Sequence, residues 1–284
     1  MTDRRSSIRK DGGALYIHTA MPDLAVSIVA AAHNEQDNLS RLLREITEAL
    51  DATDVPYEVI VIDDGSTDRT AAVLADLVLE YPRLRVLRML NTPPGAGNGQ
   101  SAAFHAGIRA ARGEVVVMLD ADCQNDPADI PPMLARLRAC DADMVQGDRS
   151  ADRRDSFVRR VSSHIGRLTR RVLLGDTIRD TGCSLRAIRR CVAVQLPLQY
   201  RGMHRFIPLT ARQLGFTVVE MPVHHRPRHA GRTKYGIANR AWPALLDCLA
   251  VRWMRRRRRD IRFDEVERPR SHIAATPHRE KAVP

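Results

Sequence analysis

Residues 115–119 form a run of five apolar residues that leads directly into two aspartates, Asp120 and Asp122, separated by one alanine. The run is short and rich in valine, so it predicts a buried strand of a parallel sheet. In open α/β sheets, ligands bind in the crevice outside the carboxyl ends of the strands. Two carboxylates at that place suit Mg²⁺ or Mn²⁺, which prefer oxygen ligands. A solvated acidic turn is the alternative, and the neighbouring sequence has to decide between the two.

Strands and helices alternate along most of the chain. The expected strands cover residues 24–32, 57–62, 84–90, 115–119 and 143–147, and the expected helices cover 38–50, a stretch ending near 80, 101–111, 127–139, 155–174 and 203–214. Strands separated by helices of this length require right-handed crossovers. The pattern therefore predicts an α/β fold with a doubly wound, mostly parallel, Rossmann-like sheet that carries helices on both faces.

Composition divides the chain into four segments. They are a flexible lead at 1–22, the α/β domain at 23–225, a basic loop and amphipathic helix at 226–262, and a disordered tail at 263–284. No run of 18 apolar residues occurs and the N-terminus is polar, so we expect neither a membrane span nor a signal peptide. Two tryptophans and the arginines at 255–259 favour a helix lying in a membrane interface, with an ordinary packed helix and a solvated basic tail as the alternative.

Net charge and aromatic content limit the classes of binding partner, and the cysteines indicate the redox compartment. A formal charge of +11 indicates attraction to phosphate, whether in nucleic acid, an anionic membrane or small molecules. Only 4% of residues are aromatic, which is low for a protein that stacks bases, so we expect no nucleic-acid partner. The five cysteines are scattered without a C-x-x-C pair, which argues against a zinc site or a disulfide framework and for a reducing compartment.

Polar clusters follow three of the expected strands: residues 33–35, the pair Asp63 and Asp64, and the pair at 120 and 122. In a doubly wound sheet these loops can converge at one edge, where a nucleotide would find acceptors for its base and ribose and a metal for its diphosphate. Helix capping accounts for Asn34 and Asp68 but not for the paired acids. The glycine-rich segment 95–99 (GAGNG) has the wrong spacing for a dinucleotide-binding motif.

Three of these segments, in this order, resemble the signature of family 2 glycosyltransferases, whose fold is called GT-A. They are 31–35 (AAHNE), 61–68 (VIDDGSTD) and 120–124 (DADCQ), and the loop at 98–103 resembles the family's segment near the donor sugar. The resemblance implies a donor nucleotide site made of Asn34, Glu35, Asp63, Asp64, Gln100 and Asp120. It also implies that Asp120 and Asp122, assisted by Gln124, hold Mg²⁺ or Mn²⁺, and that Asp122 and Asp180 are catalytic.

The second half resembles a narrower group, the polyprenyl-phosphate (dolichyl-phosphate-like) sugar transferases. The matching segments are 147–149 (GDR), 180–185 (DTGCSL), 203–206 (MHRF), 225–228 (HRPR) and 231–236 (GRTKYG), so the resemblance covers roughly residues 24–255. Arginine offers bidentate geometry for a phosphate. The residues implied for the acceptor phosphate are Arg149, Arg160, Arg226, Arg228, Arg232 and Lys234. Asp180 either positions acceptor or sugar or pins an arginine, and His224 and His225 indicate phosphate contact or packing rather than zinc.

The resemblance implies an inverting, metal-dependent transferase that moves one sugar from a UDP- or GDP-sugar to a polyprenyl phosphate. It would act at the cytoplasmic face, associated peripherally with an anionic membrane surface. Whether the chain forms a homo-oligomer is left open by the sequence. One alternative keeps the fold but uses a hydroxyl acceptor, which would need a general base. Another, from a different class, is a catalytically dead protein that binds nucleic acid or membrane through its arginine-rich end.

Overall fold

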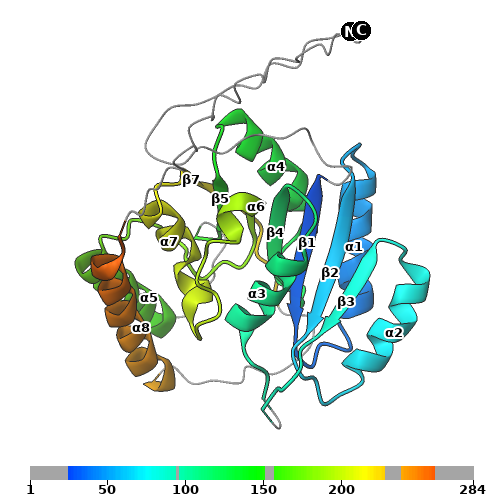
Figure 1. Cartoon of the computed structure of the whole chain (residues 1–284), viewed down its shortest axis with the longest axis horizontal. Coiled ribbons are helices and arrows are strands. Elements are labelled where there is room, and N and C mark those ends of the chain that lie inside the picture. Colours follow the sequence, from blue (N-terminus) through cyan, green and yellow to red (C-terminus); the bar gives the residue numbers. More distant parts are fainter. Residues whose placement is uncertain (1–24, 94–95, 151–156, 228–237, 260–284) are drawn as a thin grey trace, which may run out of the picture.

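The computed structural model describes residues 25–93, 96–150, 157–227 and 238–259, except for the side chains of 157–164 and 238–241. Within these ranges one seven-stranded sheet has the order β3-β2-β1-β4-β6-β5-β7 (Figure 1). The strands are β1 (Val26–Ala32), β2 (Tyr57–Asp63), β3 (Leu84–Arg88), β4 (Val115–Asp120), β5 (Met144–Asp148), β6 (Arg186–Arg189) and β7 (Val218–Pro222).

Helices connect these strands. They are α1 (Leu39–Asp51), α2 (Thr70–Glu80), α3 (Gln100–Ala110), α4 (Ile130–Ala139), α5 (Phe157–Leu174), α6 (Arg190–Ala193), α7 (Ile207–Gln213) and α8 (Ala238–Arg257). Two short 3-10 helices, η1 (Pro127–Asp129) and η2 (Met203–Phe206), precede α4 and α7. The helices expected at 127–139 and 203–214 therefore each begin with a 3-10 turn, and the other expected helices in the described ranges are confirmed.

The sheet is mostly parallel, as the alternation of elements predicts. β1 lies between β2 and β4 and is parallel to both, with Ala32 paired to Asp63 and Ala31 paired to Asp120. The carboxyl ends of these three strands therefore meet at one edge. β6 is the exception, because it lies antiparallel between β4 and β5.

Two hydrophobic cores fill the two faces of the sheet. One joins the sheet to α1, α2 and α4, and the other joins it to α3, α7 and α8. Alternation along β1 assigns Ile28 and Ala30 to the first core and Val29 to the second, as the period of a strand requires. The predicted fold with helices on both faces is confirmed.

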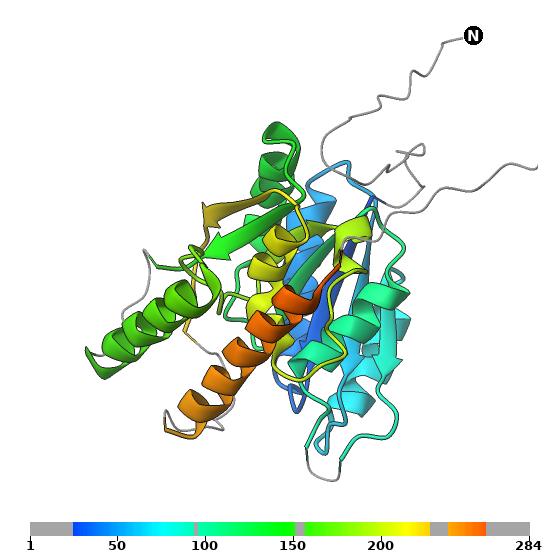
Figure 2. The same cartoon turned by 60° about the vertical axis from the view of Figure 1, so that its left-hand side comes forward.

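Helices α5 and α8 contact each other and lie side by side at the lower left of Figure 1, and they are neighbours again in Figure 2. Arg252 and Arg255 of α8 donate hydrogen bonds to the carbonyls of Leu173 and Leu174 at the end of α5, at 2.9 and 3.1 Å. Among the helices of the described ranges, none is long and apolar enough to cross a membrane.

Candidate active site

Asp64, just after β2, joins the ends of two strands to the loop before α3. Its buried carboxylate accepts hydrogen bonds from the backbone N–H groups of Asn98, at 2.8 Å, and Gly99, at 2.7 Å. Its backbone carbonyl lies 2.7 Å from the ring Nδ1 of His33, which follows β1. Asp64 thus fixes the start of α3, the helix that carries Gln100.

We expect Gly97→Ala to damage this arrangement, because an added Cβ would lie 2.6 Å from both the carboxyl carbon and the carbonyl oxygen of Asp64. Overpacking of this kind costs about 1–3 kcal/mol of unfolding free energy, which urea unfolding measures, and affinity for UDP or GDP should fall as well. The control is Gly166→Ala in α5, where the nearest atom to the new Cβ is the end of the Arg170 side chain at 4.0 Å. Equal stability of the two variants would contradict the expectation.

The loops after β1 and β2 hold each other through side-chain oxygens. Oδ1 of Asn34 accepts from the N–H of Thr67 at 2.7 Å, and the Asp63 carboxylate accepts from the N–H of Ser66 at 3.0 Å. The carboxylate of Glu35 accepts from Nδ2 of Asn38 at 2.6 Å. Asn34, Glu35 and Asp63, three of the six predicted donor-site residues, therefore lie together at one sheet edge. Asn34 and Asp63 bind backbone N–H groups there, and Glu35 binds a side chain.

Asp120 and Asp122 lie close enough to repel each other at the end of β4. Burial, and next the charge of Asp122, raise the pKa of Asp120 to about 6. Gln100 donates to Asp120, and Asp122 accepts from the N–H of Gln124 at 3.2 Å. A bound cation relieves repulsion of this kind, so the pair suits one.

The composition of this pair fits a magnesium-type ion. No group of three or more His, Cys, Asp or Glu in the described ranges could hold a metal without help. Mg²⁺, however, is usually bound by one or two carboxylates together with substrate phosphates and water. The two aspartates therefore fit an ion that arrives with a diphosphate, whereas Gln124 uses its backbone N–H to bind Asp122 and its carbonyl to bind the N–H of Arg226.

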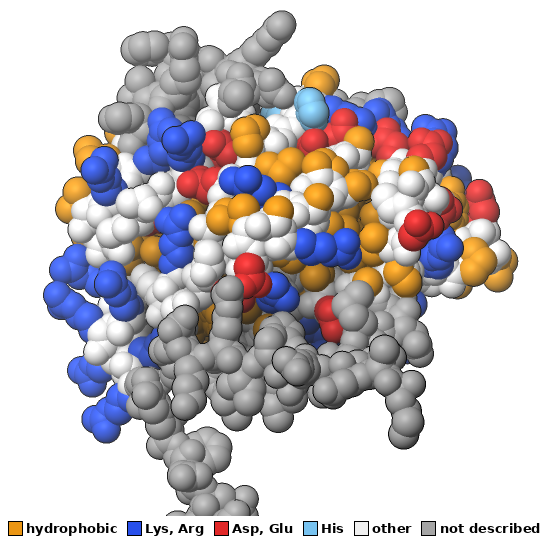
Figure 3. Space-filling view, turned by 90° about the horizontal axis from the view of Figure 1, so that it is seen from above, with side chains coloured by type: hydrophobic (Ala, Val, Ile, Leu, Met, Phe, Trp, Pro, Cys, Tyr) orange, Lys and Arg blue, Asp and Glu red, His pale blue; other side chains and the backbone are white. Residues whose placement is uncertain are grey.

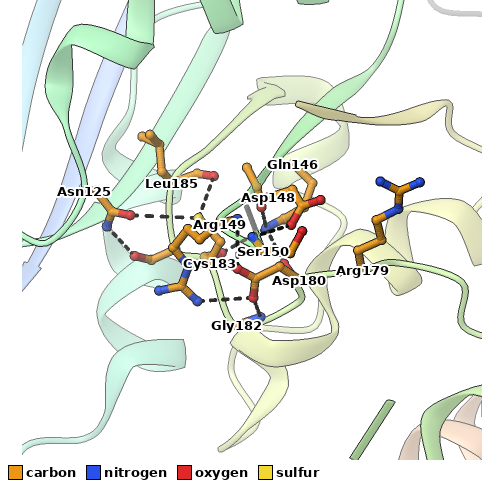
Figure 4. Close-up of polar contacts among 12 residues, drawn as sticks. Asn125, Gln146, Asp148, Arg149, Ser150, Arg179, Asp180, Gly182, Cys183 and Leu185 are labelled. Carbon is orange, nitrogen blue, oxygen red and sulfur yellow. Dashed lines mark hydrogen bonds and ion pairs between the residues drawn. The ribbon is translucent and has the colours of Figure 1, made fainter. Parts of the chain in front are cut away.

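The second cluster lies at the end of β5, two strands from β4 in the sheet (Figure 4). The Arg149 guanidinium donates to both oxygens of the Asp180 carboxylate, at 2.8 and 3.2 Å, and Gly182 N–H donates to the same carboxylate at 3.1 Å. Both side chains are largely buried. Burial lowers the pKa of Arg149, but the bond to Asp180 outweighs it and raises that pKa above its ordinary value. Of the two roles open for Asp180, the structure shows the one that pins an arginine.

Arg186, at the start of β6, lies close enough to Asp120 and Asp180 for their charges to act on it, and the sequence analysis did not single it out. Its fully buried guanidinium donates to the carbonyl of His204 at 3.0 Å and to that of Cys183, and its Nε has no hydrogen-bond partner among the described residues. Burial lowers its pKa to about 10. The sequence signal that could have indicated a buried arginine is its position between apolar residues, directly after the segment at 180–185.

His204 continues this connection toward the donor side. Its Nδ1 lies 2.8 Å from Oγ of Ser101 in the first turn of α3. Burial lowers the pKa of His204 to about 3, so the ring is neutral. Arg186 and His204 thus link the loop of Asp180 to the helix of Gln100.

The other residues predicted to bind phosphate, where the structure describes them, do not share the contacts of Arg149. Arg226 binds two carboxylates, Glu45 and Asp126, each at 2.6 Å. Nδ1 of His224 lies 2.8 Å from the Asp129 carboxylate, and His225 pairs with Asn125 in an isolated bridge. The side chain of Arg160, and the whole of Arg228, Arg232 and Lys234, lie outside the described part of the chain.

Comparison with known proteins identifies a family and several relatives of this chain. Residues 27–196 match the family model described as glycosyl transferase family 2. The chain is 38% identical over 214 residues to the undecaprenyl-phosphate 4-deoxy-4-formamido-L-arabinose transferase of Edwardsiella ictaluri, covering 75% of this chain and 63% of the relative. The Pseudomonas fluorescens enzyme of the same name is 39% identical over 214 residues, with 75% and 61% covered. The chain thus spans about three fifths of the length of these relatives.

Solved structures show the same fold. Glucosyl-3-phosphoglycerate synthase from Mycobacterium tuberculosis, in complex with Mn²⁺, UDP-glucose and phosphoglyceric acid, aligns with a TM-score of 0.60. The alignment covers 82% of this chain and 80% of the synthase at 20% identity. At that identity the likeness concerns the fold alone.

Proposed function

This chain belongs to glycosyl transferase family 2, and from this premise we propose that it transfers one sugar from a nucleotide-sugar to a polyprenyl phosphate. The observation that carries the proposal is the pairing of two unlike clusters at one sheet edge. An acidic pair, Asp120 and Asp122, suits a metal-bound diphosphate, and a buried cation, Arg149, suits a second phosphate. The names of the relatives, which are undecaprenyl-phosphate transferases, support the same acceptor.

The reaction requires little proton chemistry. An oxygen of the acceptor phosphate is already anionic and attacks the anomeric carbon from the side opposite the leaving group, which inverts the configuration. The bond from that carbon to the diphosphate oxygen breaks, and its electron pair leaves with the nucleoside diphosphate. Because no hydroxyl has to be deprotonated, the site needs no general base, and the ion pair of Asp180 with Arg149 agrees with that.

Each cluster has a defined task in this proposal. Asp120 and Asp122 would hold Mg²⁺ or Mn²⁺, which when bound supplies Lewis-acid stabilisation of the leaving diphosphate. Mn²⁺ and UDP-glucose in the structural neighbour support a divalent ion. Gln100 orients Asp120, and Asp63 and Asp64 shape the nucleoside end. Asp180 would fix Arg149 so that the remaining N–H groups of the guanidinium can meet the acceptor phosphate.

The other predicted residues complete the proposal. Arg160, Arg226, Arg228, Arg232 and Lys234 would surround the acceptor phosphate, with Arg226 held in place by Glu45 and Asp126. Since a polyprenyl phosphate lies in a bilayer, we place the enzyme at the cytoplasmic face of a membrane, associated peripherally.

The test incubates the purified chain with radiolabelled UDP- and GDP-sugars, Mn²⁺ or Mg²⁺, and undecaprenyl phosphate in detergent. We expect organic-soluble label with one donor, lost when EDTA removes the metal, and no label when undecaprenol replaces the phosphate. Label on the alcohol or on a saccharide would show the hydroxyl-acceptor reaction instead. Absence of label with every donor would contradict the proposed activity.

A further inference from the structure

Helices α5 and α8 expose an unusual amount of apolar surface. Seven of the twelve large hydrophobic side chains that are exposed in the described ranges lie on these two helices. They are Ile165, Leu168 and Val172 on α5, and Trp242, Leu246, Leu249 and Trp253 on α8. Such a concentration marks an interaction surface rather than scattered surface hydrophobics.

Each group forms one stripe on its helix. The α8 residues follow one another at intervals of four, three and four, and those of α5 at intervals of three and four, which are the spacings of a single helix face. Cys248 and Val251 of α8, and Leu174 of α5, are buried on the other sides. Both stripes therefore point away from the core, while the hydrogen bonds from Arg252 and Arg255 hold the two helices together.

The charged side chains around the two apolar stripes are mostly positive. Helix α5 contains no Asp or Glu, and the one acid of α8, Asp247, lies 3.8 Å from Arg205. Arg167 and Arg171 of α5 and the arginines at 255–259 are exposed. Figure 3 shows basic side chains gathered along the left-hand edge, the side on which Figure 1 places α5 and α8. A partner that matches this surface should therefore have anionic groups at its surface and an apolar interior beneath them.

We propose that α5 and α8 together form a docking surface for an anionic lipid bilayer, with the apolar stripes inserted among the headgroups and the arginines on lipid phosphates. This inference rests on the proposed function, because a polyprenyl phosphate is reached only at a bilayer. The position of α5 supports it, since α5 begins eight residues after Arg149 in the chain. In the sequence, the docking surface thus follows closely on the residue assigned to the acceptor phosphate.

The chain contains its own probe of this surface. Its only two tryptophans, Trp242 and Trp253, are both on the α8 stripe and are 66% and 61% exposed. We expect their emission to shift to shorter wavelength with phosphatidylglycerol vesicles, to be quenched by brominated lipid, and to change little with phosphatidylcholine alone. Added salt should weaken the shift, because exposed charges are screened.

A double variant, Leu246→Asp with Leu249→Asp, keeps both tryptophans and should reduce cosedimentation with phosphatidylglycerol vesicles by about tenfold or more. The control is Leu79→Asp on α2, where the side chain is 87% exposed and remote from the surface, and which should bind like the parent chain. Circular dichroism confirms that all three proteins are folded. Equal vesicle binding by the double variant and the parent, or none by the parent, would overturn the proposal. So would light scattering that shows a dimer broken by the double variant, since a second copy would then cover this face.

The activity assay separates this inference from the proposed function. With undecaprenyl phosphate in detergent, the double variant should keep the turnover of the parent chain, because docking is then not needed. If the parent binds vesicles but transfers no sugar in detergent, the proposed function fails and the docking surface stands. If the parent transfers sugar in detergent but ignores vesicles, the docking surface fails and the function stands.

Discussion

Asp120→Asn and Asp122→Asn should each lower the rate of sugar transfer by on the order of 10²–10³-fold, the loss seen when one preorganised electrostatic contact to developing charge is removed. Unfolding in urea should show no loss of stability for Asp120→Asn. The reason is that the Asp120 carboxylate is already disfavoured by burial and by Asp122, as its raised pKa shows, and an asparagine oxygen still accepts from Gln100. Activity and stability should therefore separate in this variant.

The melting temperature gives a second measurement, which tests whether the loss of transfer rate results from a loss of metal binding. In the parent chain we expect Mn²⁺ to raise the melting temperature further when UDP or GDP is present, and in both variants this additional increase should disappear. The matched control is Asp76→Asn, an exposed aspartate on α2, which should keep both activity and the metal effect. A near-normal rate with unchanged metal dependence in either site variant would remove the two aspartates from the proposed metal site.

Asp180→Ala should cost about 3–5 kcal/mol of unfolding free energy, because it leaves the largely buried guanidinium of Arg149 without its carboxylate. The N–H of Gly182 loses its acceptor as well. Combining Asp180→Ala with Arg149→Met should recover part of that loss, since no buried charge then stays unpaired. Turnover should not recover, because the proposed phosphate ligand is gone. Urea unfolding and the transfer assay measure the two quantities on the same samples.

The ion pair of Arg170 with Asp176 offers a matched control. Arg170 Nε and the Asp176 carboxylate lie 3.1 Å apart, and this carboxylate is also buried. The pair joins the end of α5 to the following loop, outside the proposed site. Asp176→Ala should therefore lose comparable stability while the folded protein keeps its turnover in detergent. If Asp180→Ala retained full turnover at a temperature where it is folded, Asp180 and Arg149 would be structural only.

The local pattern of the sequence was enough to predict most of the fold and the meeting of the acidic residues at one edge of the sheet. Buried parallel strands are continuous apolar runs, and helices with one buried face, such as α1, repeat at three and four residues. Because parallel strands align their carboxyl ends, Asp63, Asp64 and Asp120 had to meet once the sheet was assigned. These features depend on neighbours in the chain.

The features that were missed depend on distant contacts. β6 has only four residues and begins with an arginine, so it shows no apolar run of its own. The buried role of Arg186 depends on His204, and the pairing of Arg226 depends on Glu45, which is 181 residues away. No spacing along the chain encodes such partners, and they become visible only when the elements pack.

The antiparallel insertion of β6 also sets an order of assembly during synthesis. The pairs among β1, β2, β3 and β4 use residues 26–120, so this half of the sheet can form as soon as that part has emerged from the ribosome. β5 has no bond to this half until residues 186–189 arrive to lie between β4 and β5. We therefore expect nascent chains cut after about residue 150 to protect the first four strands from protease, while protection of β5 requires a chain that extends beyond β6. The half of the sheet that carries Asp120 would then form before the half that carries Arg149.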